Sequence, residues 1–190
     1  MKNRYYSILA AVMLSFGTMS ASAQAFSSES LHVSAGFGIG GYLSYVSYGN
    51  FTNSPALFLA VEKGTNIELG PGTVGIGGFA AYKTAGYTYE YFGITDEAHW
   101  TNAVVGARGG WHLNTLANEK LDLYGALNLG LVFQSYKYTS SFYTETSTKS
   151  NFLYYSFSVG GKYFFTDAIG AFAELGWDIA YLKAGVAISL

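Results

Sequence analysis

The chain has 190 residues and a formal net charge of −2; 12% of its residues are charged, 18% are aromatic, and none is cysteine. Soluble domains carry about 25% charged residues, so this chain is unusually poor in charge. Its 50% hydrophobic content excludes intrinsic disorder, the lack of cysteine excludes disulfide and thiol chemistry, and the near-neutral charge argues against nucleic acid as a partner.

The N-terminus predicts a signal peptide over residues 1–23. Lys2 and Arg4 precede a short apolar stretch at residues 8–16, and Ala21-Ser22-Ala23 forms a small-x-small cleavage site before Gln24. The apolar stretch is shorter than the roughly 20 residues that a membrane-spanning helix needs. We therefore expect an exported protein whose residues 24–190 form one domain.

The mature chain shows hydrophobic alternation with a period of two residues. In residues 121–134 the odd positions carry leucine, glycine and phenylalanine, whereas the even positions are mostly small or polar. A helix would scatter these leucines around its circumference, so the pattern predicts a strand. The segment is longer than the roughly 5–6 residues of an ordinary strand and suits a tilted membrane strand, which needs about 9–11.

The same pattern predicts eight strands and hence an all-β fold, an eight-stranded antiparallel up-and-down transmembrane β-barrel. The predicted strands cover residues 31–43, 55–63, 72–86, 99–113, 121–137, 152–165, 168–177 and 180–190. Between them, long loops (44–54, 87–98, 138–151) alternate with shorter turns (64–71, 114–120, 166–167). Such barrels have long extracellular loops and short periplasmic turns. The last two strands are predicted to be joined by a two-residue turn, Asp178-Ile179.

Charged residues test this barrel against a soluble, lipocalin-like one, which would be polar outside and apolar inside. Apart from Lys63 at a strand end, the strand charges lie opposite the apolar face, as they must if that face contacts lipid, where a Lys or Arg costs ~2–4 kcal/mol. We expect Glu174 to face Lys183 across the last hairpin. The predicted structural network of lumen charges comprises Glu62, Arg108, Lys162, Glu174 and Lys183.

Large side chains are also predicted to point inward and to plug the lumen, which in an eight-stranded barrel is just wide enough for side chains to fill. These residues are Tyr124, Tyr154, Phe164 and Tyr181. A general diffusion porin is therefore not expected, because porins have about 16–18 strands. We also expect no catalytic residue, no cofactor and no metal ion.

Three stretches, residues 106–112 with 121–126, 159–165 and 170–177, resemble the outer-membrane β-barrel domain family common in Bacteroidetes, one of the small OmpA/OmpX-like barrels. The resemblance implies an integral outer-membrane protein surrounded by lipid and lipopolysaccharide. The final strand resembles the C-terminal signal that the barrel-assembly machinery reads, with key positions at Lys183, Gly185, Ile188 and Leu190. These motifs specify architecture rather than activity.

The favoured function is a non-enzymatic one, in envelope structure or in surface interaction through the long extracellular loops, with an extracellular partner that the sequence does not identify. One alternative is an enzyme that modifies lipid A, with His99 beside Asp96 and Glu97 and with Ser140 or Ser141 across the barrel mouth. His32 and His112 are expected at the turn ends, in the wrong leaflet for that reaction. A conduit for hydrophobic small molecules is a further alternative.

Overall fold

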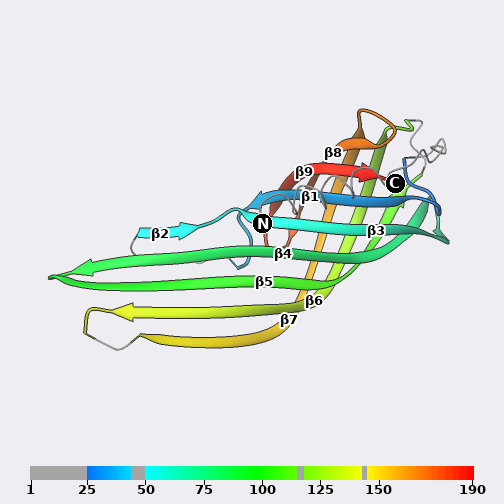
Figure 1. Ribbon diagram of the computed structural model, residues 1–190. Helices are drawn as coiled ribbons and strands as arrows, with labels where there is room; N and C mark the ends of the chain where they lie inside the picture. The colour runs from blue at the N-terminus through cyan, green and yellow to red at the C-terminus, as the bar shows by residue number, and fades with distance from the viewer. Residues whose placement is uncertain (1–24, 44–49, 115–117, 143–144) are drawn as a thin grey trace, which may run out of the picture.

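The computed structural model describes residues 25–43, 50–114, 118–142 and 145–190 of the chain (Figure 1). The predicted signal peptide and its cleavage site lie outside these residues. The described part contains nine strands: β1 (Leu31–Ile39), β2 (Asn50–Asn53), β3 (Ala56–Leu69), β4 (Gly72–Tyr91), β5 (Ile94–Leu113), β6 (Leu121–Ser140), β7 (Thr146–Phe164), β8 (Ile169–Trp177) and β9 (Leu182–Ser189). In the described ranges, no helix is long and apolar enough to span a membrane.

Eight of these strands close into a ring. From β3 to β9 each strand pairs antiparallel with the next along the chain, and β1 pairs antiparallel with both β3 and β9. The closing pairing runs from His32 opposite Ser189 to Ile39 opposite Leu182. The all-β, antiparallel, up-and-down barrel is therefore confirmed. Closure leaves the ring without a free edge, so its backbone groups are satisfied within the sheet.

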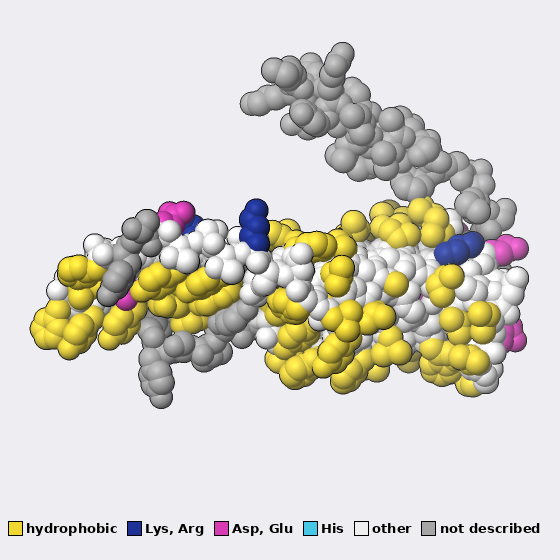
Figure 2. Space-filling model, turned by 90° about the horizontal axis from the view of Figure 1, so that it is seen from below, with side chains coloured by type: hydrophobic (Ala, Val, Ile, Leu, Met, Phe, Trp, Pro, Cys, Tyr) yellow, Lys and Arg dark blue, Asp and Glu magenta, His cyan; other side chains and the backbone are white. Residues whose placement is uncertain are grey.

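Alternation along each strand separates the outer wall of the barrel from its interior. The outer wall is apolar, and Leu127, Leu129 and Leu153 are 68%, 58% and 64% exposed. Figure 2 shows hydrophobic side chains over the barrel wall, whereas the charged side chains on that face lie toward the ends of the barrel or on the sheet beyond it. The apolar belt, as we call this surface, includes Phe37, Leu57, Leu59, Ile76, Val105, Leu131, Phe157, Val159, Leu175 and Val186.

Strands β4 to β7 are about twice as long as a bilayer crossing requires. They have 20, 20, 20 and 19 residues and continue beyond the barrel as a projecting sheet, which Figure 1 shows at the left. We define the projecting sheet as β2 with residues 84–91, 94–101, 135–140 and 146–151. The predicted loops 87–98 and 138–151 are thus mostly strand, which is a correction to the sequence analysis. Their Tyr and Thr content, interpreted as loop composition, is equally typical of strands.

Three connections also differ from the prediction. The predicted loop 44–54 contains β2, which pairs with the projecting part of β4. The predicted turn 64–71 is mostly strand, because β3 continues to Leu69, past a register shift between Gly64 and Glu68. The link between β8 and β9 has four residues, 178–181, instead of two.

The β8–β9 link dips into the barrel, which is why it is longer than a tight turn. Asp178, Ile179 and Ala180 are all buried, and Asp178 contacts Lys183 inside the barrel. Tyr181, expected in the lumen, instead lies outside with 42% of its surface exposed, and its ring packs on Trp177.

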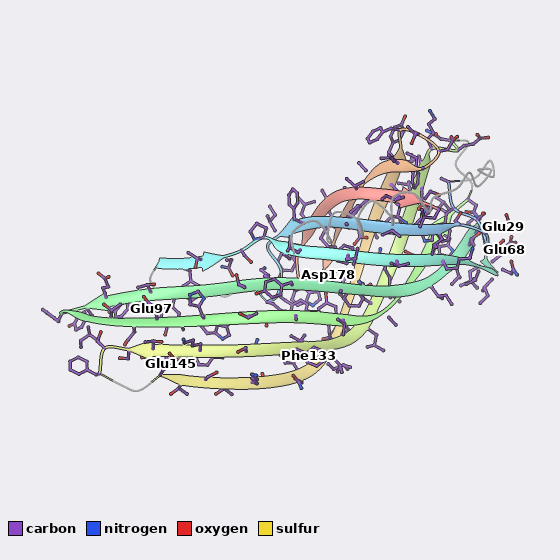
Figure 3. The ribbon with its side chains drawn as sticks, in the orientation of Figure 1. Glu29, Glu68, Glu97, Phe133, Glu145 and Asp178 are labelled. Atoms are coloured by element: carbon purple, nitrogen blue, oxygen red, sulfur yellow. The ribbon has the colours of Figure 1, made fainter. Side chains whose placement is uncertain are left out.

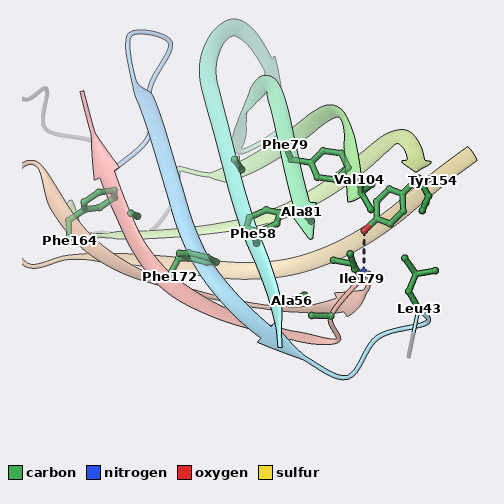
Figure 4. Close-up of a cluster of buried hydrophobic side chains, with 14 residues drawn as sticks. Leu43, Ala56, Phe58, Phe79, Ala81, Val104, Tyr154, Phe164, Phe172 and Ile179 are labelled. Carbon is green, nitrogen blue, oxygen red and sulfur yellow. Dashed lines mark hydrogen bonds between the residues drawn. The ribbon is translucent and has the colours of Figure 1, made fainter. Parts of the chain in front are cut away.

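Side chains fill the interior from end to end. At the turn end Phe26 is buried and stacks on His112, with ring centroids 3.5 Å apart. Apolar residues continue toward the loop end, where the backbone N–H of Ile179 donates a hydrogen bond to the Tyr154 hydroxyl at 3.1 Å (Figure 4). The buried apolar cluster comprises Leu43, Ala56, Phe58, Ala60, Phe79, Ala81, Val104, Val132, Tyr154, Phe164, Phe172, Ile179, Ala180 and Ala187.

Candidate functional site

The interior charges form one connected set of ion pairs and hydrogen bonds, which we call the lumen network. All five charged residues that the sequence analysis placed in the lumen belong to it, and the structure adds four further members. Every member is at most 3% exposed. The network comprises His32, Glu62, Arg108, His112, Asp122, Lys162, Glu174, Asp178 and Lys183.

Arg108 occupies the centre of the network. Its Nε donates to Glu62 Oε2 at 3.2 Å and its Nη2 donates to Glu174 Oε1 at 2.6 Å, so one guanidinium bridges two carboxylates. Its Nη1 donates to the amide oxygen of Asn128 at 3.3 Å. The planar fork of an arginine suits this arrangement, because its donors point in several fixed directions. Strands β3, β5, β6 and β8 are thereby connected through one side chain.

Toward the loop end, the network continues from Glu174 to the β8–β9 link. Glu174 lies directly opposite Lys183 in the strand register, and Lys183 Nζ is 2.6 Å from Glu174 Oε2. Tyr124 also donates to Glu174, at 2.8 Å. Lys183 Nζ is equally close, at 2.6 Å, to Asp178 Oδ2, and the Tyr154 hydroxyl donates to the other Asp178 oxygen.

Toward the turn end, the network continues through two histidines. His112 lies between two carboxylates, with Nε2 2.8 Å from Glu62 Oε1 and Nδ1 2.8 Å from Asp122 Oδ1. Lys162 Nζ is 3.4 Å from Asp122 Oδ2 and 3.2 Å from His32 Nδ1. A continuous path of charged and polar groups therefore runs through the barrel interior from β1 to the β8–β9 link.

The sequence analysis missed the network roles of His32, His112, Asp122 and Asp178. A signal was present for His32, His112 and Asp122, because each has the inward parity of its strand. The histidines were considered only as catalytic candidates, and this parity was not applied to them. Asp178 offered no such signal, since it lies in a connection whose path depends on the buried partners that it finds.

The buried charges are balanced in number. Among the described residues, four buried carboxylates (Glu62, Asp122, Glu174, Asp178) accompany four buried cations (Lys83, Arg108, Lys162, Lys183). Lys83 lies apart from the lumen network and donates to the backbone carbonyl oxygens of Gly40 and, at 3.3 Å, Ile179. Since a buried charge needs an ion-pair or hydrogen-bond partner, these contacts support a structural role for the interior.

Glycines make room for the network at one crowded point. A Cβ atom on Gly110 would lie 1.9 Å from Glu62 Oε1 and 2.7 Å from His112 Nε2, both of which are held in hydrogen bonds. The neighbouring Gly109 points outward, and a Cβ atom there would have no neighbour within 4 Å. Position 110 therefore requires glycine because the Glu62 carboxylate leaves no room for a side chain, whereas position 109 has room for one.

The structure separates His99 from two of its candidate partners in the possible lipid-modifying site, Asp96 and Ser140. The register places Lys137 opposite His99 and Ser140 opposite Asp96. Since positions 96 and 99 are an odd number apart on one strand, their side chains lie on opposite faces of the sheet. His99 therefore points away from both Asp96 and Ser140, whereas Glu97, two residues away on β5, shares its face.

The projecting sheet has two chemically different faces. One face is continuous with the lumen and carries half-buried aromatic rings, among them Tyr87, Trp100 and Tyr136. The other face is continuous with the apolar belt but carries Thr, Ser, Glu, His and Lys side chains. Burial, with a further contribution from nearby Tyr87, raises the pKa of the Tyr136 phenol, so this hydroxyl is neutral at physiological pH.

One groove of about 830 Å³ lies in the apolar belt rather than in the lumen. Its walls come from adjacent positions on β4 to β7, where the small residues Ala107 and Gly109 leave a hollow between larger apolar side chains. The lining includes Ile76, Leu127, Leu129, Tyr155 and Phe157. The groove is thus a dent in the outer wall and does not lead through the barrel.

These features define the protein as a closed β-barrel with a charge-paired interior and a projecting sheet. No protein-family model and no curated protein sequence matches the chain. Among solved structures, the chain is similar to two crystal structures of Ail, the attachment invasion locus protein of Yersinia pestis. One of these structures is a complex with the heparin analogue sucrose octasulfate. In both, the identity is 16%, the match covers 86% of this chain and 96% of Ail, and the TM-score is 0.44.

The glycine beside the network gives a first prediction. Gly110→Ala is expected to destabilise the barrel by about 1–3 kcal/mol, because its methyl group displaces Glu62 from His112 and Arg108. Gly109→Ala is the matched control and is expected to leave the free energy of unfolding unchanged or slightly raised. Urea unfolding of both variants in detergent measures the difference, and equal effects at the two positions would refute the steric account.

The pair across the last hairpin gives a second prediction. Lys183→Met is expected to cost about 3–5 kcal/mol, since it leaves Glu174 and Asp178 without their shared cation. A double-mutant cycle with Glu174→Gln is expected to give a coupling energy of about 0.5–3 kcal/mol.

Lys149→Met on the projecting sheet serves as the control for removal of a lysine charge. Because Lys149 is exposed, its loss is expected to change stability by no more than about 0.5 kcal/mol. A coupling energy of zero between Glu174 and Lys183 would mean that each charge is separately hydrated, contrary to the buried geometry.

Proposed function

We propose that this protein is a non-enzymatic, integral outer-membrane β-barrel that presents its projecting sheet at the cell surface. The observation that carries this proposal is the reversed distribution of polarity, with apolar side chains outside and paired charges inside. A barrel in water would expose its charges and bury its leucines. In a bilayer the same distribution is favourable, because lipid solvates the belt and the lumen network satisfies the charges.

The filled interior supports a structural or surface role over the conduit alternative. The lumen network and the apolar cluster occupy the barrel between Phe26 at one end and Ile179 at the other. Both of these residues are at most 2% exposed. The described interior thus offers a ligand no open path, and the lipid-modifying alternative gains no support from Asp96 or Ser140, which lie on the opposite face of the sheet from His99.

The projecting sheet is proposed to lie outside the cell. Outer-membrane barrels have short periplasmic turns and longer extracellular segments. Here the short turns, such as Gly70-Pro71 between β3 and β4, lie at the end opposite the projecting sheet. Figure 3 shows Glu97 and Glu145 at the end of the molecule formed by the projecting sheet and Glu29 and Glu68 at the far end, so these acidic side chains lie on either side of the apolar belt.

The route to the membrane is part of the proposal. Residues 1–23 would direct export, and the barrel-assembly machinery would read the terminal strand through Lys183, Gly185, Ile188 and Leu190. Lipid and lipopolysaccharide would then contact the apolar belt and its groove. Membership of the Bacteroidetes outer-membrane barrel family is proposed on the sequence resemblance alone.

A truncation that keeps the strand register tests the proposed function. Removing residues 87–91 and 94–98 joins Gly86 to His99 through the native Phe92-Gly93 turn, whose positive φ values of 45° and 81° suit a tight hairpin. Replacing residues 138–146 by Asn-Gly shortens the neighbouring hairpin in the same way. The barrel, the apolar belt and the lumen network are left intact.

Both the full chain and the truncated chain are expected in the outer-membrane fraction, with heat-modifiable electrophoretic mobility and β-type circular dichroism. Protease added to intact cells is expected to cleave only the full chain, within its projecting sheet. Adherence of displaying cells to other cells is expected to fall to the level of the empty vector upon truncation. Recovery of the full chain as a soluble periplasmic protein would refute the proposed function.

A further inference from the structure

The aromatic residues of the projecting sheet all lie on one face. We call this the aromatic face; it is the one continuous with the lumen. On the opposite face the corresponding positions carry Thr, Ser, Asn, Gly, Glu, His and Lys and no aromatic residue. The aromatic face comprises Phe51, Tyr87, Tyr89, Tyr91, Trp100, Tyr136 and Tyr138.

Four of these rings form a file that crosses the strands. Phe51 stacks on Tyr87 with centroids 5.3 Å apart, and the Tyr87 ring lies 5.9 Å from Trp100. The Trp100 ring lies in turn 5.1 Å from Tyr136. The four rings come from β2, β4, β5 and β6, and all of them are half-buried. Farther out along the sheet, Tyr89 and Tyr91 are 45% and 56% exposed, and Figure 2 shows hydrophobic side chains gathered at that far end.

Two polar side chains on the same face each carry one buried atom without a hydrogen-bond partner. Asn102, the next residue after Trp100 on this face of β5, is 0% exposed, and its amide nitrogen has no partner. One carboxylate oxygen of Asp96 is also buried without a partner. Such atoms cost free energy unless a ligand or water satisfies them. They thus provide an unused donor and an unused acceptor on either side of the ring file.

The aromatic face also carries little charge. Asp96 is the one charged side chain of the described projecting sheet on this face, whereas Glu90, Glu97, Lys137 and Lys149 lie on the other. A polyanion or a strongly charged protein would find no complementary charge here. A purely apolar ligand would leave the amide nitrogen of Asn102 and one carboxylate oxygen of Asp96 unsatisfied.

We propose that the aromatic face binds a neutral polysaccharide, laid across the strands along the file of rings. A pyranose ring has an apolar face of C–H groups, which stacks on aromatic rings, and a rim of hydroxyls, which both donate and accept hydrogen bonds. The aromatic rings would stack on the apolar face of the sugar, and its hydroxyls would offer partners to the two unpaired atoms, Asn102 Nδ2 and Asp96 Oδ1. This inference rests on the proposed surface location and names the class of ligand.

Affinity electrophoresis of the full chain, folded in detergent, tests the proposal directly. Native gels containing dextran, mannan or a mixed-linkage β-glucan are the neutral probes, and heparin is the polyanion control. We expect at least one neutral probe to retard the protein and heparin not to. Trp100→Ala and Tyr136→Ala are each expected to weaken that retardation about ten-fold, as for loss of a stacked ring.

Matched variants separate binding from folding. Thr101→Ala and Ser135→Ala change neighbouring positions on the opposite face, and both are expected to bind as the unmodified chain does. Tyr136→Phe keeps the ring and is expected to retain most of the binding. Comparing it with Tyr136→Ala tests the role of the ring even if Trp100→Ala does not fold. Heat-modifiable mobility shows which variants are folded.

The possible outcomes distinguish this inference from the proposed function. The inference would be overturned if heparin alone retards the protein or if no probe does. It would also be overturned if the ring variants are retarded as strongly as the unmodified chain. A second outcome is that the truncated chain is still inserted but loses adherence, while no neutral polysaccharide binds the full chain or competes for adherence. In that case the proposed function stands, and a protein partner replaces the polysaccharide. If the full chain is found to be soluble, the proposed function itself fails.

Discussion

The bridge that Arg108 makes between Glu62 and Glu174 is the interaction on which the rest of the barrel depends. Each carboxylate is also held by a second cation or by histidine, so this bridge links the two halves of the lumen network. Buried ion pairs add little net stability compared with apolar packing, but they are costly to break once formed. Their effect here is to specify which residues meet across the barrel.

This specification matters because a β-sheet can slip in register. A shift by one residue between two strands would turn every inward side chain outward. Glu62, Arg108 and Glu174 come from β3, β5 and β8, and they meet only when all the intervening strands keep their register. In the proposed membrane setting a slipped barrel would place at least one of these charges against lipid, where an arginine costs ~2–4 kcal/mol. The lumen network and the apolar belt thus enforce the same register from opposite sides of the sheet.

The long strands change their chemistry where they leave the barrel while keeping their alternation. On the outer wall, leucine and valine give way to threonine, serine and charged residues. On the inner face, the buried charges give way to the aromatic residues of the projecting sheet, beyond a row that contains Lys83 and Asn102. The same four strands therefore serve two environments, with the boundary marked by composition rather than by any break in hydrogen bonding.

Much of this architecture was predictable from the sequence. Alternation located all eight strands of the barrel and assigned Leu129 and Arg108 to opposite faces, because lipid and lumen impose opposite demands on neighbouring residues. Strand ends were less predictable, since Thr and Tyr near residues 87–98 suit both strands and loops. The path of Asp178 could not be foreseen, because it depends on Lys183 and Tyr154, which meet it only in the folded barrel.

The central claim is that paired charges and packed side chains close the barrel along its length. Conductance of the purified protein in a planar lipid bilayer tests this claim most directly. The account predicts insertion without discrete conductance steps, in both polarities and at high salt, because the network leaves no continuous water path. Regular, reproducible steps from the folded, heat-modifiable protein would contradict it.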